Sequence, residues 1–214
     1  MPTTHTATTA RWSAYLALAC LVILAGMVLV VGALTPGYSH LAHYISELGA
    51  RGAPHEWLFR LGGFAPAGLA LLGFCLLAHR ALPRSRRTTL ALLGLAVYAA
   101  GYLVAAAFPC DLGCRPATPS ASQLIHNAAG GIGYLLAPTV LFALGREARG
   151  WPGAGALALA GYGASALALV GLFTLSPTSP MAGLSQRLLE AAVLGWSALC
   201  GVYLARQPRH GQAR

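Results

Sequence analysis

Six apolar stretches, each close to the length of a membrane-crossing helix, restrict what this chain can fold into. They comprise residues 14–34, 58–78, 90–108, 124–144, 154–173 and 188–204. A helix needs about 20 apolar residues to cross roughly 30 Å of hydrocarbon. Lipid offers no partners for backbone N–H and C=O groups, and these stretches are too long and continuous for the alternating strands of a barrel. The sequence therefore predicts an all-α polytopic membrane protein, a bundle of six transmembrane helices.

The composition supports this fold class, because hydrophobic residues make up 57% of the chain and charged residues only 9%. A water-soluble globule of this size needs far more polar surface. We expect a transmembrane domain over residues 14–205, with short tails at 1–13 and 206–214.

The arginines predict how the bundle is oriented, since positive residues in short loops stay on the cytoplasmic side. All 14 basic residues are arginines, and those near the tails and in the second and fourth loops are Arg11, Arg80, Arg84, Arg86, Arg87, Arg146, Arg149, Arg206, Arg209 and Arg214. We therefore predict a multi-pass protein of the plasma membrane with both termini in the cytoplasm. No nucleic-acid-binding or nucleotide-binding motif accompanies these scattered charges, so the expected partners are membrane lipids and neither nucleic acid nor nucleotide.

The segment after the first apolar stretch carries the densest polar chemistry. Ser39 can cap a short helix on which His40, His43 and Glu47 share one face. Such a helix can simply lie on the membrane surface, with Glu47 paired to His43 or to Arg51. Alternatively, two imidazoles and a carboxylate on one face can begin a zinc or iron site. Both interpretations stay open from the sequence.

The third loop brackets an acid between two cysteines, Cys110 and Cys114. An outer, oxidising location permits a disulfide between them. Such a small ring would mainly fix the direction of Asp111.

Polar residues also stand where the fourth and sixth stretches begin. His126 and Asn127 open the fourth, and Arg187 precedes Glu190 by one turn at the sixth. A carboxylate inside a span is costly unless it is paired. We expect Glu190 to pair with Arg187, or with a neighbour such as Arg60 or His126. The pair is either a structural lock between helices or part of a site.

Four of the five acidic residues belong to the side opposite the arginine-rich loops, namely Glu47, Glu56, Asp111 and Glu190. The outer mouth of the bundle is therefore the candidate site.

Several short motifs resemble one known family. Ser-Glu-Leu-Gly at 46–49, Phe-Pro at 108–109 with Asp111, and His126 at the start of the fourth stretch resemble the domain of unknown function 998 family of prokaryotic integral membrane proteins. The resemblance covers most of the chain and implies a multi-pass helical membrane protein, with no established activity to transfer. A weaker resemblance is to membrane hydrolases of the alkaline ceramidase and progestin-receptor-like superfamily. The paired histidines of their late helix are absent here, which puts a zinc amidase mechanism in doubt.

Two classes of function follow. The first is a binding bundle that holds a lipid or small ligand at an outward cavity, where the expected ligand-binding residues are Ser46, Asn127, Arg187, Glu190 and Arg60. Transport is the weaker form of this class, because the polar residues lie near the outer ends of the spans rather than at mid-membrane.

The alternative is a membrane-embedded enzyme, such as a metal-dependent hydrolase, acting on a lipid-borne substrate at the outer leaflet. Its expected acid and base residues are Asp111, His126 and Glu47. A zinc or iron ion that activates water would instead be held by His40, His43, His126 and Asp111. Whether these side chains converge decides between the classes.

Overall fold

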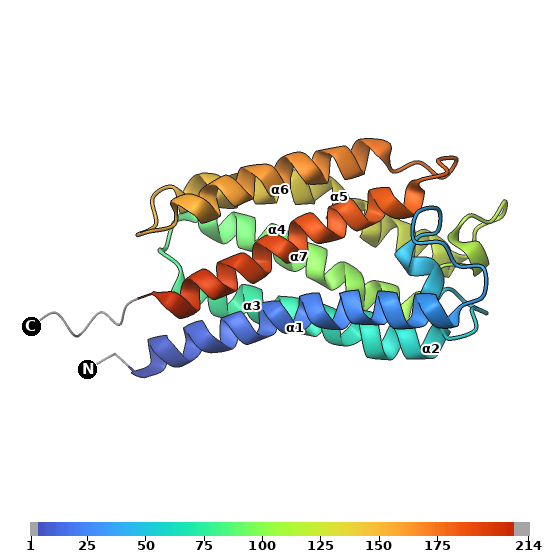
Figure 1. Cartoon of the computed structure of the whole chain (residues 1–214), viewed down its shortest axis with the longest axis horizontal. Coiled ribbons are helices and arrows are strands. Elements are labelled where there is room, and N and C mark those ends of the chain that lie inside the picture. The colour runs from blue at the N-terminus through green and yellow to red at the C-terminus, as the bar shows by residue number, and fades with distance from the viewer. Residues whose placement is uncertain (1–3, 208–214) are drawn as a thin grey trace, which may run out of the picture.

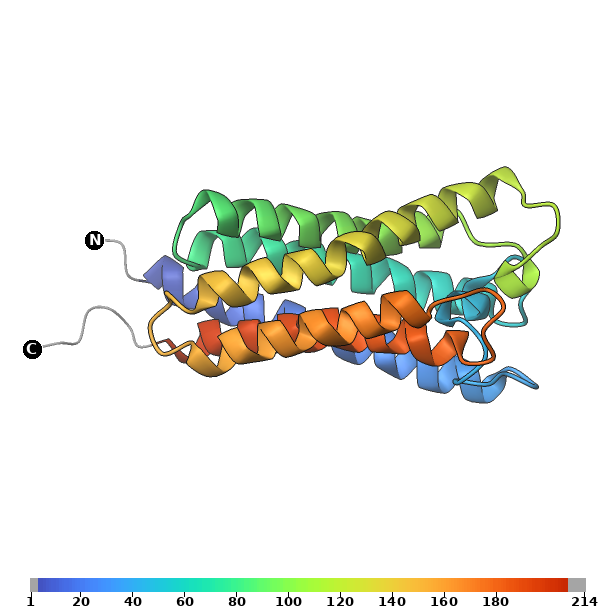
Figure 2. The same cartoon turned by 90° about the horizontal axis from the view of Figure 1, so that it is seen from above.

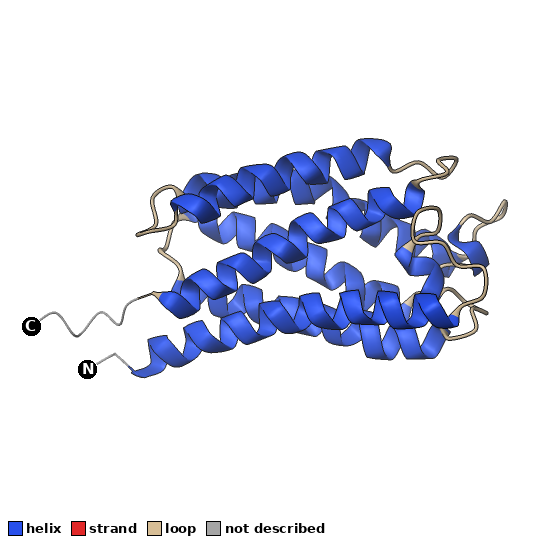
Figure 3. Ribbon diagram, in the orientation of Figure 1, coloured by secondary structure: helices blue, strands red, loops and turns tan. Residues whose placement is uncertain are grey.

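The computed structural model describes residues 4–207 and confirms the all-α class. The described part consists of helices and loops and contains no strand (Figure 3). Six of its helices are long and apolar enough to cross a membrane. Residues 1–3 and 208–214 of the predicted tails, with Arg209 and Arg214, lie outside the described residues.

The helices follow the predicted stretches closely. The long ones are α1 (Thr4–Leu34), α3 (Ala65–Ala81), α4 (Arg86–Ala107), α5 (Ala121–Ala148), α6 (Gly155–Thr174) and α7 (Ala182–Arg206). A short helix α2 (Glu56–Phe59) and a π-helical turn η2 (Arg60–Phe64) run directly into α3, so the second crossing extends over Glu56–Ala81. Two 3₁₀ turns, η1 (Ile45–Gly49) and η3 (Leu112–Cys114), lie in the loops.

Serine caps set two of the helix starts. The Ser85 side chain accepts a hydrogen bond from the backbone N–H of Thr88 at α4, and Ser120 accepts one from Gln123 at α5. Each cap satisfies one of the backbone donors that a first helical turn leaves free.

The crossings form an up-and-down ring in which neighbours in sequence are neighbours in space. The order is α1, α3, α4, α5, α6 and α7, and α7 closes the ring on α1 (Figures 1 and 2). Small residues allow close approach within it: a Cβ added at Gly161 of α6 would lie 2.5 Å from the Cα of Gly145 on α5. This is the packing that small residues permit between membrane helices.

The two ends of the bundle differ in chemistry. One end holds the start of α1, the end of α7 and the arginine-rich connections α3–α4 and α5–α6 (Figure 1). We call it the basic end, and the arginine pattern predicts that it faces the cytoplasm. The opposite, capped end carries the loops 35–55, 108–120 and 175–181.

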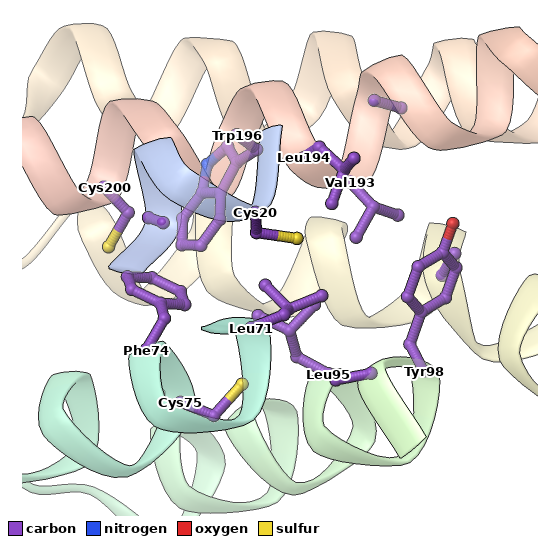
Figure 4. Close-up of a cluster of buried hydrophobic side chains, with 14 of the residues drawn as sticks. Cys20, Leu71, Phe74, Cys75, Leu95, Tyr98, Val193, Leu194, Trp196 and Cys200 are labelled. Atoms are coloured by element: carbon purple, nitrogen blue, oxygen red, sulfur yellow. The ribbon is translucent and has the colours of Figure 1, made fainter. Parts of the chain in front are cut away.

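A sealed apolar core fills the bundle between its ends. Phe74 and Trp196 are fully or almost fully buried, and the free cysteines Cys20, Cys75 and Cys200 pack among the apolar side chains (Figure 4). The cysteines therefore act as small apolar residues, as their positions within the spans predict. Large apolar side chains on the outside of the ring, such as Leu69, Leu135 and Leu159, face away from the core.

The predicted helix carrying His40, His43 and Glu47 on one face is wrong. Tyr44 is extended, with φ −60° and ψ 149°, and only Ile45–Gly49 wind into a 3₁₀ turn. The segment is instead bonded to α7: Leu184 N–H donates to Leu41 C=O at 2.9 Å, and Ile45 N–H donates to the Gln186 side chain at 2.6 Å. These bonds replace the intrahelical ones that a single surface helix would make.

Candidate functional site

A cavity of about 40 Å³ lies between α4 and α5 toward the capped end of the bundle. Its lining comes from both helices and from η1, η2 and α7: Ser46, Phe64, Tyr98, Gly101, Tyr102, Ala105, His126, Ala129, Gly130, Gly133, Tyr134, Gln186 and Glu190. A cavity needs roughly 10–15 Å³ to hold one water, so this cavity has room for a few waters or one small polar group.

Glu190 is the acidic group of this cavity, and only 7% of its surface is exposed. Three tyrosine hydroxyls donate to its carboxylate: Tyr98 at 2.8 Å, Tyr134 at 2.9 Å, and Tyr102. The predicted arginine or histidine partner is therefore wrong. The acid is satisfied by neutral donors, which the sequence reasoning missed.

Two of these tyrosines share one face of α4. Tyr98 and Tyr102 are four residues apart, so their rings project from the helix in the same direction. Their centroids lie 5.7 Å apart in an edge-on arrangement, and Tyr102 also stacks on Phe64 at 6.0 Å. Figure 4 shows Tyr98 at the margin of the apolar cluster. Tyr98 is also one of the residues that line the cavity. The paired tyrosines in an otherwise apolar helix were the available sequence signal.

Gln186 connects the cavity to the capped end. Its Nε2 donates to the Tyr134 hydroxyl at 2.7 Å, while its Oε1 accepts from the backbone N–H of Ile45. Tyr134 in turn donates to Glu190. A continuous chain of hydrogen bonds thus joins η1 to the buried carboxylate.

Arg187 holds the first loop rather than Glu190. Its guanidinium donates to the Tyr38 hydroxyl at 2.7 Å, to His40 Nδ1 at 3.0 Å and to the His43 carbonyl at 3.1 Å. It also donates to the Gly183 carbonyl at 2.9 Å, within its own helix. Arg187 therefore anchors the loops of the capped end, which we call the cap, and it does not line the cavity.

The contact with Arg187 makes His40 sensitive to pH. Arginine can only donate, so His40 Nδ1 is the acceptor and the ring is neutral in this contact. Burial, together with the nearby Arg187 charge, lowers the pKa of His40 below its ordinary 6.5. The unfolded chain then binds this proton more readily. The resulting stabilisation is present above the unfolded pKa and is lost as the pH falls through the lower folded pKa.

We therefore expect backbone amides of the loop around His40 to exchange faster at pH 5 than at pH 7.5, after correction for intrinsic exchange rates. A His40→Gln variant, which has no titrating ring, should lose this acid sensitivity, whereas a His55→Gln control should retain it. Hydrogen exchange read by mass spectrometry measures the effect. Equal acid sensitivity in His40→Gln and wild type would contradict the assignment.

Cys110 and Cys114 form a disulfide that lies against Ser46, a residue of the cavity wall. The Ser46 hydroxyl is 3.4 Å from Cys114 Sγ, and the Ser46 carbonyl oxygen is 3.5 Å from Cys110 Sγ. Since Ser46 lines the cavity, the bridged loop supports one of its walls.

Asp111 lies outside this cavity. Its carboxylate accepts from the backbone N–H of Ser120 at 2.9 Å, and its own N–H donates to the Gln123 side chain at 2.8 Å. Hydrogen bonding from Ser120 lowers the pKa of the Asp111 carboxyl below its ordinary value. The acid thus helps to join the disulfide loop to the start of α5.

Glu47 also has a structural partner away from the cavity. Its Oε1 accepts from Tyr44 N–H at 2.9 Å and lies 3.6 Å from the Arg115 guanidinium. Arg115 additionally donates to the carbonyls of Ala42 and Pro177, both at 3.0 Å, so it joins its own loop to the loops 35–55 and 175–181. The expected pairing of Glu47 with His43 or Arg51 is replaced by this contact.

The remaining predicted residues divide between the cavity and its surroundings. His126 lines the cavity, and its Nδ1 lies 3.0 Å from the Phe108 carbonyl oxygen. Asn127 accepts from Gln123 at 2.8 Å, and Arg60 donates to the Ala106 carbonyl at 2.7 Å. Of the predicted ligand-binding and catalytic residues, the cavity therefore brings together Ser46, His126 and Glu190.

The predicted zinc or iron ligands are engaged separately. His40 contacts Arg187, His43 Nδ1 accepts from Ser39 N–H at 3.0 Å, and His126 contacts a backbone carbonyl. Within residues 4–207, no group of three or more His, Cys, Asp or Glu side chains is arranged to hold a metal ion. This conformation does not assemble a metal centre from His40, His43, His126 and Asp111.

The family is decided by one match. The model described as "Protein of unknown function (DUF998)" matches residues 17–203 of the chain. The chain belongs to the DUF998 family. No curated protein and no solved structure matches it. DUF998 membership, together with the six long apolar helices, makes this a multi-pass membrane protein and leaves its activity to be argued from the site.

Proposed function

We propose that this DUF998 protein binds the polar head of a lipid, or of another small amphiphile, in the cavity between α4 and α5. In this proposal the capped end faces outward from the plasma membrane, as the arginines predict. The observation that carries the proposal is the buried Glu190 carboxylate, which lines a cavity and is not sealed inside the core.

The energetic cost of this acid supports a functional role. A carboxylate within a membrane span is expensive, and such residues are commonly functional. Here three tyrosine hydroxyls donate hydrogen bonds to the carboxylate, and the same carboxylate lines the cavity. A purely structural lock between helices needs no adjoining cavity.

The wall of the cavity at α5 suggests where a ligand enters. Gly130 lines the cavity on α5, and a Cβ added there would meet nothing within 4 Å. The same two helices bear exposed apolar side chains, such as Leu135 on α5 and Val97 on α4, which suit contact with lipid tails. A ligand entering between α4 and α5 would therefore come from the bilayer, with its tail left among the lipids.

Binding is better supported than hydrolysis because the predicted acid–base residues do not share one space. Of Asp111, His126 and Glu47, only His126 lines the cavity. Asp111 and Glu47 are bonded within the loops of the capped end. A binding role requires only the cavity and its polar wall, whereas catalysis requires acid and base to reach one substrate atom.

Two adjacent glycines provide a matched test. Gly130 and Gly131 both have open space at the Cβ position, but only Gly130 lines the cavity. Purified variants would be offered an equimolar mixture of dioleoyl phosphatidylethanolamine, dioleoyl phosphatidylglycerol and dioleoylglycerol, and bound lipid would be counted by native mass spectrometry. We expect wild type and Gly131→Leu to retain one lipid, and Gly130→Leu to retain about tenfold less, which corresponds to about 1.4 kcal/mol. Equal retention by both variants would contradict the proposal.

A further inference from the structure

We propose that the group held in the cavity is an ammonium, either the protonated amine of a lipid headgroup or that of a free amphiphilic amine. This inference rests on the proposed binding function and names the class of ligand. It follows from which hydrogen-bonding groups the cavity wall leaves available, from its charge and from its aromatic surface.

The tyrosine hydroxyl donors of the cavity wall are already engaged, which leaves the wall rich in acceptors. The hydroxyl hydrogens of Tyr98, Tyr102 and Tyr134 are all directed to Glu190. Gln186 donates to the Tyr134 hydroxyl. The carboxylate and the tyrosine oxygens, which belong to residues that line the cavity, have further lone pairs that can accept hydrogen bonds. A ligand that brings hydrogen-bond donors therefore fits this wall better than one that brings acceptors.

His126 adds a further acceptor. Its Nδ1 faces the Phe108 carbonyl oxygen, which can only accept, so this nitrogen carries the hydrogen. In the neutral ring the other nitrogen, Nε2, is then an acceptor. An ammonium has three N–H donors and no acceptor, which complements a wall of this kind.

The charge of the site points the same way. The ion pairs within residues 4–207 are Arg60 with Glu56 and Arg115 with Glu47, and neither includes Glu190. The nearest arginine along α7, Arg187, is bonded to the first loop and acts on Glu190 through its charge alone, without a direct contact. A bound cation would supply the counter-charge that a buried carboxylate needs.

Aromatic rings and size complete the match. Phe64, Tyr98, Tyr102 and Tyr134 all line the cavity, and aromatic faces attract cations, more strongly when the contact is desolvated. An ammonium group is close to water in size, and about 40 Å³ can accommodate it with one or two waters.

The test compares ligands that differ only at the head. Protein in nanodiscs would receive dodecylammonium or dodecanol in one arm, and dioleoyl phosphatidylethanolamine or dioleoyl phosphatidylglycerol in the other, at equal mole fractions. The readout is the thermal unfolding midpoint as a function of ligand. We expect an apparent affinity at least about tenfold higher for dodecylammonium than for dodecanol, and likewise for the phosphatidylethanolamine than for the phosphatidylglycerol. Preference in both arms shows that any membrane-borne amine is accepted, and preference in the lipid arm alone identifies the headgroup as the source.

The charge requirement is tested with two variants. Glu190→Gln should remove the preference for amines, whereas Glu147→Gln, which makes the same change at the basic end, should keep it. If Glu190→Gln does not fold, the comparison on wild type still decides. Equal binding of amine and alcohol by wild type would overturn the ammonium assignment and leave the binding function standing. Absence of binding by every probe, together with equal lipid retention by Gly130→Leu and Gly131→Leu, would overturn both.

Discussion

Glu190→Ala is expected to lower the free energy of unfolding by about 2–4 kcal/mol, because three tyrosine hydroxyls then lose their common acceptor. Hydrogen bonds between membrane helices average about 0.6 kcal/mol each, and the deletion adds the cost of buried donors left unpaired, about 1–3 kcal/mol for each that finds no new partner. Reversible unfolding in mixed micelles, with dodecyl sulfate as the denaturant, measures the change.

Glu190→Gln provides the comparison for this prediction. The amide retains one oxygen that can accept, so the expected loss is about 1 kcal/mol, typical of one altered hydrogen bond. If alanine and glutamine at this position both unfold like wild type, the tyrosine cluster contributes nothing to the fold and the structural assignment fails.

Gly183→Ala is expected to have the second large effect, on the cap. A Cβ added at Gly183 would clash with the His43 carbonyl oxygen and would lie 2.8 Å from that of His40. Both obstacles are backbone atoms, so the first loop must move away from α7. We expect a loss of about 2–3 kcal/mol, in the range of overpacked cores. We also expect faster hydrogen exchange around His43, because the displaced loop loses its bonds to Arg187.

Gly195→Ala is the control within the same helix. Its Cβ would meet nothing within 4 Å, so alanine should be neutral or stabilise by up to about 1 kcal/mol through helix propensity. Similar unfolding curves and exchange rates for Gly183→Ala and Gly195→Ala would show that the cap is not seated on α7.

The fold could be predicted because each membrane crossing depends mainly on the apolar length of its own stretch of sequence. Apolar length determines the crossings, and within a residue each predicted stretch coincides with a helix or part of one. The 3₁₀ turn after Tyr44 could not be predicted, since it depends on bonds to Gln186 and Leu184, more than 130 residues away. Local spacing favoured one continuous helix there, and tertiary contacts overrode it.

The site was only partly accessible from the sequence. Glu190 and His126 stood out as polar residues near the ends of apolar stretches, and Ser46 stood out as part of the first outer loop. All three line the cavity. Tyr98 and Tyr134 did not stand out, because the rotation of each helix decides where a tyrosine hydroxyl points and the sequence does not show that rotation. The prediction that Glu190 pairs with an arginine rested only on charge and spacing. Neither shows that Arg187 is already bonded to the first loop.

The central claim is that the Glu190 cavity holds the head of a membrane-borne ligand. An experimental density map of wild-type protein in nanodiscs of dioleoyl phosphatidylethanolamine tests it most directly. We predict density for a head group between α4 and α5, beside Gly130 and within hydrogen-bonding distance of the Glu190 carboxylate. A map in which side chains fill the cavity, with lipid ordered only on the outside of the ring, would contradict the account.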